Sequence, residues 1–398
     1  MAKQPVKKKD VAKLSSSTED KMASIMKFKK ANKLENVKDK ELEWITLPEA
    51  FYDAVKLPGI PKGFFSMVRG LPNTGKSTIK LCLIAQCQKM GILPVIYETE
   101  GNFPWDHARM CGVEFTDVYE DVEEELIDEE TGVITTKIVK KVVDHEGFFL
   151  YFDQEILYNR YGKMDYAQGK ELSKPNRKIA VLEDIAYSIN DLLDQQGNGE
   201  DEIDCEMCFI WDSVGSLPCY RSVMSKTGNN MFDAAALKQS FNSIISNRIP
   251  ISRKEKSPYT NTLFAVNKVW VDNMQMGQPQ LKNSGGEGFM YAVRLLIEMG
   301  GIVSAGVAPL KATSGGSDYH FGIQTKIKVK KNHVNDITYE GKICSVPHGL
   351  WNPDKLDEYK KQHSKYLLNK MKNVFSNENI NENSEIEFEK VGNGDDEK

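Results

Sequence analysis

Residues 69–78, RGLPNTGKST, carry the most specific chemical pattern in the sequence. They follow the apolar run FFSMV and match the glycine-rich loop pattern GxxxxGK(S/T). In such a loop the glycines let backbone N–H groups point at phosphate oxygens, the lysine adds positive charge at the β and γ phosphates, and the hydroxyl can bind Mg²⁺. We therefore expect a site for ATP and Mg²⁺. Its expected residues are Gly70, Leu71, Pro72, Asn73, Thr74, Gly75, Lys76, Ser77 and Thr78.

Acidic side chains end two apolar runs further along the chain. In CFIWDS the run ends at Asp212, as expected of an acid that holds magnesium through water, so Ser77 and Asp212 are the predicted metal residues. In VIYETEG the run ends at Glu98 and Glu100, and one of these could align the attacking water as general base. The residues alone leave that choice open.

Short apolar runs alternate with helical stretches along the chain. The runs are too short and too rich in β-branched or aromatic residues for helices, and they lack clean alternation. Such strands, spaced by helices, are typical of a largely parallel sheet covered on both faces. We predict an α/β domain over residues 45–352, with a largely parallel central sheet flanked by helices. The expected strands are 93–97, 148–152, 207–211, 262–266 and 293–299, and the expected helices are 77–90, 178–195 and 231–247.

The remaining segments are assigned from composition and pattern. The first has five lysines and little to bury, and the last is acidic and polar, so both are predicted to be disordered. An acidic insertion interrupts the domain, and its stretch 132–143 alternates as in a hairpin. The predicted segments are a basic arm (1–17), a helix and linker for oligomerisation (18–44), the insertion (117–178), a Gly/Ser-rich loop (300–318), a C-terminal helix (353–373) and an acidic tail (374–398).

The composition is that of an ordinary globular chain, with 40% hydrophobic and 27% charged residues. No apolar run is long enough to cross a bilayer, and the first residues lack the apolar core of a signal peptide. Seven cysteines fit reduced thiols. We therefore expect a cytoplasmic protein with no membrane partner.

The net charge of −5 is unevenly distributed. Residues 117–130 hold nine acids and no bases, and residues 375–398 hold eight acids and two lysines. The rest of the chain is basic, so it could bind a polyanion. The acidic tail either competes for that surface or only keeps the chain in solution, and composition does not decide between the two.

The order of the motifs resembles the RecA-like recombinase family, closest to phage UvsX-type strand-exchange proteins. The resemblance implies a RecA-type P-loop ATPase core and covers roughly residues 45–350. The segments that carry it are LPGIPKGFFSMVRGLPNTGKST, VIYETEGNFPWDHARMCGVEF, FIWDSVGSL, LFAVNKVWVDN, SGGEGFMYAVRLLIEM and IKVKKNHVND.

The resemblance also implies roles for single residues. It places the general base at Glu100 rather than Glu98, so that the implied catalytic residues are Glu100, Lys76 and Lys268. After Asn267, Lys268 stands where the family has a glutamine that senses the γ-phosphate, and a lysine would contact that phosphate as a charge. His107 occupies the position of an aromatic residue that stacks on adenine. Lys331 and His333 match the basic pair that reaches the ATP of a neighbouring subunit.

Two loops would contact DNA if the resemblance holds, residues 218–230 and 269–286. Cations next to aromatic rings suit single-stranded DNA, because phosphate contact gives affinity and stacking tolerates any base. The alternative is surface loops with incidental lysine and tryptophan. The expected DNA-binding residues are Tyr220, Arg221, Lys226, Trp270, Lys282, Gly285 and Gly286.

The leading hypothesis is an ATP-dependent DNA recombinase, a DNA-dependent ATPase that forms filaments on single-stranded DNA and pairs them with duplex DNA in recombination and repair. The N-terminal helix would dock on the next subunit and make a homo-oligomer. A loader and a single-strand-binding protein are candidate partners, and a phage-encoded chain would act in the host cytoplasm. The alternatives are a RecA-fold hexameric DNA helicase and an ATP-binding recombinase paralogue or mediator with little hydrolysis.

Overall fold

The computed structural model describes residues 18–33, 37–127, 134–225, 230–272, 280–283, 286–301, 306–314 and 317–375. The chain divides into two units, one formed by residues 1–40 with 254–256 and the other by residues 41–253 with 257–398. In the first unit, the predicted N-terminal helix is present as α1 (Thr18–Ala31). Its apolar side chains Met22, Ile25, Met26 and Phe28 are exposed.

The second unit is built on a large sheet with the strand order β17-β16-β15-β13-β3-β11-β10-β4-β7. Its central strands are nearly continuous buried apolar runs, as expected for parallel strands covered on both faces. A mixed α/β fold with a large, mostly parallel central sheet is therefore confirmed. The parallel strands are β13 (Leu295–Met299), β3 (Phe65–Gly70), β11 (Thr262–Asp272), β10 (Met207–Val214), β4 (Leu93–Glu98) and β7 (Leu150–Phe152).

The sheet continues in antiparallel fashion beyond β13, through β15 (Ser317–Asn332), β16 (Glu340–Val346) and β17 (Gly349–Trp351). β14 (Val307–Ser314) pairs with β15, so the loop predicted over 300–318 is wrong for these residues. Leu310, Ala312 and Ser314 are buried at alternate positions of β14. The Gly/Ser-rich composition around β14 hides this two-residue period in the sequence. Pairing with the long strand β15 stabilises β14.

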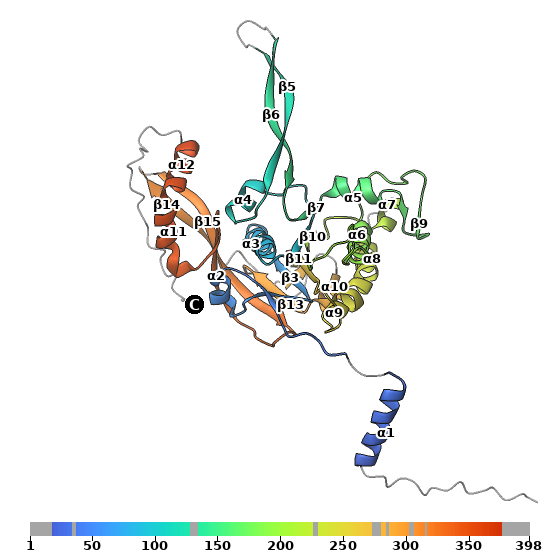
Figure 1. Cartoon of the computed structure of the whole chain (residues 1–398). Coiled ribbons are helices and arrows are strands. Elements are labelled where there is room, and N and C mark those ends of the chain that lie inside the picture. The colour runs from blue at the N-terminus through green and yellow to red at the C-terminus, as the bar shows by residue number, and fades with distance from the viewer. Residues whose placement is uncertain are drawn as a thin grey trace, which may run out of the picture. The chain divides into compact units, whose positions relative to one another are not determined.

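Helices cover both faces of the parallel strands (Figure 1). On one face, α2 (Glu49–Val55), α3 (Lys76–Lys89) and α4 (Trp105–Met110) pack in one apolar cluster with Val68 and Ile210. On the other, α5 (Gln154–Tyr161), α6 (Leu182–Asp194), α8 (Asn230–Ser243) and α10 (Gly286–Ala292) pack with Met67 and Phe209. Neighbouring strand residues thus face opposite clusters, which fixes the strand register.

Of the stretch 132–143, predicted to form a hairpin, residues 134–143 lie in β6 (Ile134–Glu146), which pairs antiparallel with β5 (Thr116–Ile127) in a two-stranded sheet, and residues 132–133 lie outside the described residues. The C-terminal helix predicted over 353–373 is wrong as a single element. A 3₁₀ turn (Pro353–Lys355), α11 (Leu356–Gln362) and α12 (Ser364–Phe375) replace it. The break is at His363, whose ring stacks on His348 at 3.7 Å and whose backbone leaves helical geometry.

Short elements complete the described chain, and no helix in it is long and apolar enough to cross a membrane. The predicted basic arm and nearly all of the predicted acidic tail lie outside the described residues. The short elements are β1 (Trp44–Thr46), β2 (Gly59–Pro61), β8 (Met164–Asp165), β9 (Lys170–Glu171), α7 (Tyr220–Ser225), a π-helical turn (Ile244–Arg248), α9 (Ile249–Ser252) and β12 (Gln280–Asn283).

Candidate nucleotide-binding and catalytic site

The glycine-rich loop joins the end of β3 to the start of α3, as the pattern predicts. A Cβ atom on Gly70 would overlap the backbone carbonyl of Met299 on the neighbouring strand. Gly75 has φ +90°, in the left-handed region that side chains disfavour, and it directly precedes the first residue of α3. Both glycines are therefore required by the backbone, and the loop forms a cradle whose shape fits a phosphate chain.

Lys76 is the first residue of α3 and is buried. Its Nζ donates a hydrogen bond to the Leu71 carbonyl at 2.6 Å, which holds the ammonium over the loop. Burial lowers the pKa of Lys76 to about 8, and the positive charge of Lys268 adds to this effect against the acids Asp212 and Glu100. The structure thus brings four residues together that lie far apart in the sequence: Lys76, Glu100, Asp212 and Lys268.

A cavity of about 600 Å³ opens beside the loop. Residues 73–78 line one side, and His107 from α4 lines it together with Phe321, Ser345 and Tyr366. Within the described part of the chain, the buried Nε2 of His107 has no hydrogen-bond partner. Burial lowers the pKa of His107, so the ring is neutral. A neutral imidazole whose Nε2 is left unpaired in this cavity suits contact with a nucleotide base.

The pKa of Lys76 leads to a prediction about pH. Below pH 8 the lysine is already charged before ATP arrives, whereas above pH 8 the free protein must take up a proton to bind ATP. We expect ATP affinity to fall about twofold between pH 7 and 8 and by up to about tenfold per pH unit above pH 8.

Calorimetric titration with Mg·ATP at pH 7.5, 8.5 and 9.5, in buffers of different ionisation enthalpy, measures both the affinity and the proton uptake. In Lys76→Arg the guanidinium stays charged over this range, so its affinity should be level. An equally level profile in the unmodified protein would contradict the assignment of Lys76.

Glu98 and Asp212 face each other in register on the parallel strands β4 and β10. Lys80, one turn into α3, lies between them, with its Nζ 3.0 Å from Glu98 Oε2 and 2.6 Å from Asp212 Oδ2. Lys80 is fully buried; burial alone would lower its pKa, but the two carboxylates outweigh this and raise it. The sequence analysis missed this residue, and the only available signal was a lysine on the apolar face of the predicted helix.

Glu98 and Glu100 differ sharply in their surroundings. Glu98 is 1% exposed, and burial raises its pKa even though Lys80 opposes the shift. The Glu100 side chain is 31% exposed and accepts hydrogen bonds from Ser213 and from Lys268, whose Nζ lies 2.7 Å from its Oε1. Burial would raise the pKa of Glu100, but these two hydrogen bonds outweigh it and lower the pKa. Glu100 is therefore the more accessible carboxylate of the two, and the one whose pKa is lowered.

Other residues expected at the nucleotide lie away from this cavity. Asn267 is fully buried on the central strand β11, near the sulfur atoms of Met67 and Met290. Lys331 donates to the Tyr291 carbonyl at 2.9 Å, and burial together with Arg294 lowers its pKa. His333 is exposed on the same strand end. Neither Lys331 nor His333 lines the cavity of its own chain.

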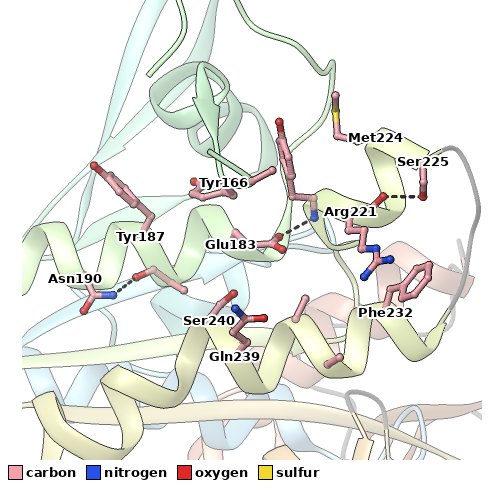
Figure 2. A pocket seen from close by; sticks show the side chains of 15 residues that line it. Tyr166, Glu183, Tyr187, Asn190, Arg221, Met224, Ser225, Phe232, Gln239 and Ser240 are labelled. Atoms are coloured by element: carbon pink, nitrogen blue, oxygen red, sulfur yellow. Dashed lines mark hydrogen bonds between the residues drawn. The ribbon is translucent and has the colours of Figure 1, made fainter. Parts of the chain in front are cut away.

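The predicted DNA residues fall in two places. Tyr220 is 6% exposed, its oxygen accepts a hydrogen bond from Asn176, and it lines a cavity rather than the outer surface. Arg221 lies over the ring of Phe232 at 4.2 Å, at the rim of a cavity of about 900 Å³ between α6, α7 and α8 (Figure 2). Glu183 faces this cavity, and burial raises its pKa to about 7.

The second predicted DNA loop contains a short antiparallel ribbon of β11 and β12. Trp270 and Lys282 are directly opposite each other in its register. Gly286 has φ +74° at the start of α10. Lys226 and Gly285 lie outside the described residues.

The fold and this set of residues define an α/β protein with a glycine-rich loop between a strand and a helix and a carboxylate-rich strand edge beside it. Over 152 residues, or 37% of this chain, it is 27% identical to Protein RecA from two strains of Ureaplasma parvum serovar 3. Over 60 residues, or 15% of the chain, it is 37% identical to Protein RecA of Nitratidesulfovibrio vulgaris strain Miyazaki F.

These matches cover 46% of the Ureaplasma proteins and 17% of the Nitratidesulfovibrio protein, so the chain spans less than half the length of the relatives it matches. No protein-family model matches the chain. The partial similarity supports a RecA-like family. It does not distinguish the phage UvsX-type members.

Proposed function

We propose that this chain is an ATP-dependent DNA recombinase that forms filaments on single-stranded DNA and promotes homologous pairing and strand exchange. The observation that carries the proposal is the convergence of Lys76, Asp212, Glu100 and Lys268 beside the glycine-rich loop, close enough for their charges to interact. The similarity to RecA proteins supports the same class. We further propose that the chain is of the phage UvsX type of strand-exchange protein.

In this proposal each residue of the site has a separate task. The loop amides and Lys76 bind the β and γ phosphates, and His107 contacts the base. Ser77 and Asp212 would hold Mg²⁺, which supplies charge neutralisation at the phosphates when bound. Glu100 stays charged and orients the attacking water as general base. Lys80 holds the Asp212 carboxylate in place through its 2.6 Å contact.

Lys268 connects the nucleotide to the DNA surface. Its ammonium pairs with Glu100, so a γ-phosphate would compete with that carboxylate for the same positive charge. Lys268 and Trp270 are two residues apart on β11, and Trp270 lies in the ribbon opposite Lys282. A shift of Lys268 toward the phosphate would therefore be transmitted along one strand to the proposed DNA-binding ribbon. Arg221 on α7 is a further proposed phosphate contact.

ATP turnover measured with and without single-stranded DNA, together with negative-stain electron microscopy, tests the proposal. We expect turnover to be stimulated by DNA and the protein to form open helical filaments. Closed rings that unwind duplex DNA would indicate a hexameric helicase instead. ATP binding without turnover in either condition would indicate a paralogue or mediator.

A further inference from the structure

The β5–β6 hairpin is the part of the second unit that the proposed function does not use. It extends away from the central sheet as a two-stranded ribbon (Figure 1), and within the described residues each strand pairs only with the other. We call residues 119–124 and 137–142 the arm. A lone two-stranded ribbon is at best marginally stable in water. The arm nevertheless exposes Tyr119 by 55% and Ile138 by 65%.

The root of the arm is fixed to the core. Asp117 at the start of β5 accepts hydrogen bonds from Arg109 of α4 at 2.6 Å and from His145 of β6 at 2.9 Å. The ring of His145 also packs on Trp105 of α4, with centroids 4.0 Å apart. These contacts with α4 therefore fix the direction in which the arm leaves the core. A fixed direction favours binding of a partner by the arm.

The two strands of the arm carry opposite charges. β5 contributes only acids there and β6 only lysines, and opposite residues pair across the ribbon, as Glu120 with Lys141 and Asp121 with Lys140. Lys141 also forms an ion pair with Glu124 at 2.6 Å. One open edge of the ribbon is therefore acidic and the other is basic. The charged residues are Glu120, Asp121, Glu123, Glu124, Lys137, Lys140 and Lys141.

We propose that the arm pairs edge to edge with the arm of a second copy of this chain, β5 of one copy against β6 of the next. Strand edges carry unpaired N–H and C=O groups that a further strand can satisfy. Pairing β5 with β5 would set acids against acids, and pairing β6 with β6 would set lysines against lysines, which is unfavourable. Only pairing of β5 with β6 places acids opposite lysines at the new contact, as they already are within the hairpin.

This pairing is head-to-tail, so it leaves an open edge at each end and can continue from copy to copy. It goes beyond the proposed function because it involves neither ATP nor DNA. DNA is a poorer occupant of the arm, because the acids of β5 offset the lysines of β6. Exposed apolar side chains such as Tyr119 and Ile138 would be covered by the added strand.

Photo-crosslinking of the full-length protein tests the contact. Tyr119 is replaced by p-benzoyl-phenylalanine, and the protein is irradiated with ATP and single-stranded DNA. We expect a crosslink between chains that mass spectrometry maps to residues 137–142 of a second copy. The same replacement at Ile251, which is 59% exposed and far from the arm in sequence, should give no crosslink to the arm. Crosslinks from position 119 only to DNA or to the core, or none between chains, would overturn the proposal.

A charge-swapped arm supplies the second test. The changes Glu120→Lys, Asp121→Lys, Glu124→Lys, Lys137→Glu, Lys140→Glu and Lys141→Glu keep every opposite pair within the hairpin. Swapped chains should crosslink to each other like the unmodified protein. In mixtures, crosslinks from unmodified β5 to swapped β6 should fall about tenfold or more. Equal crosslinking in both combinations would overturn the proposal, while normal ATP turnover in the swapped variant would leave the proposed function standing.

Discussion

Glu100→Gln is expected to lower the rate of ATP hydrolysis by a factor of about 10² to 10⁴, the usual contribution of a positioned general base. The amide cannot accept a proton, yet it keeps the size of the side chain and a hydrogen bond with Ser213. ATP binding should therefore persist, because the loop and Lys76 are untouched. Single-turnover hydrolysis and a separate calorimetric titration with Mg·ATP measure the two effects.

Two controls make the Glu100 result specific. Lys76→Ala should lose ATP binding as well as turnover, because it removes the charge that contacts the phosphates. Glu98→Gln should retain the charged base at Glu100, so its loss of turnover should be much smaller than that of Glu100→Gln. The reverse order of the two glutamate variants would show that the base had been assigned to the wrong residue.

Lys80→Met is expected to reduce the free energy of unfolding by about 3–5 kcal/mol, the usual cost of removing one partner from a buried ion pair. The methionine fills a similar volume, but Glu98 and Asp212 are left facing each other without the ammonium that lies within 3.0 Å of both. Denaturant unfolding monitored by tryptophan fluorescence measures the change. The variant should also need more Mg²⁺ for half-maximal turnover, because Asp212 loses its positioning contact.

Two matched variants separate the charge effect from a loss of packing. Lys89→Met lies on the exposed end of the same helix and should change the free energy of unfolding little. Adding Glu98→Gln to Lys80→Met removes the uncompensated carboxylate, so the double variant should recover a large part of the lost stability. If the double variant were no more stable than Lys80→Met, charge would not be what holds Lys80, Glu98 and Asp212 together.

The glycine-rich loop shows how much of the local structure a short sequence pattern predicts. Its glycines, lysine and hydroxyl lie within ten residues, between an apolar run and a predicted helix, and the structure places a strand, a turn and a helix there in that order. The alternation of apolar runs with helical stretches likewise predicted the mostly parallel sheet. In β14 the same approach failed, because glycine and serine around a short strand outweigh its weak alternation. The C-terminal helix was also predicted as one piece, because the stacking of His363 on His348 is not visible in helix periodicity.

The same distinction, between local pattern and tertiary packing, applies to the candidate site. The sequence by itself determined which residue types gather at the strand ends, because apolar strands and the acids that follow them are local features. Only the tertiary structure decided that Glu98 is buried against Lys80 while Glu100 is accessible beside Lys268. Lys80 and Asp212 are 132 positions apart, and their contact exists only because α3 packs on the sheet beside β10. Charges and burial of this kind depend on which segments fold together, and that is a property of the packed chain rather than of any short stretch of it.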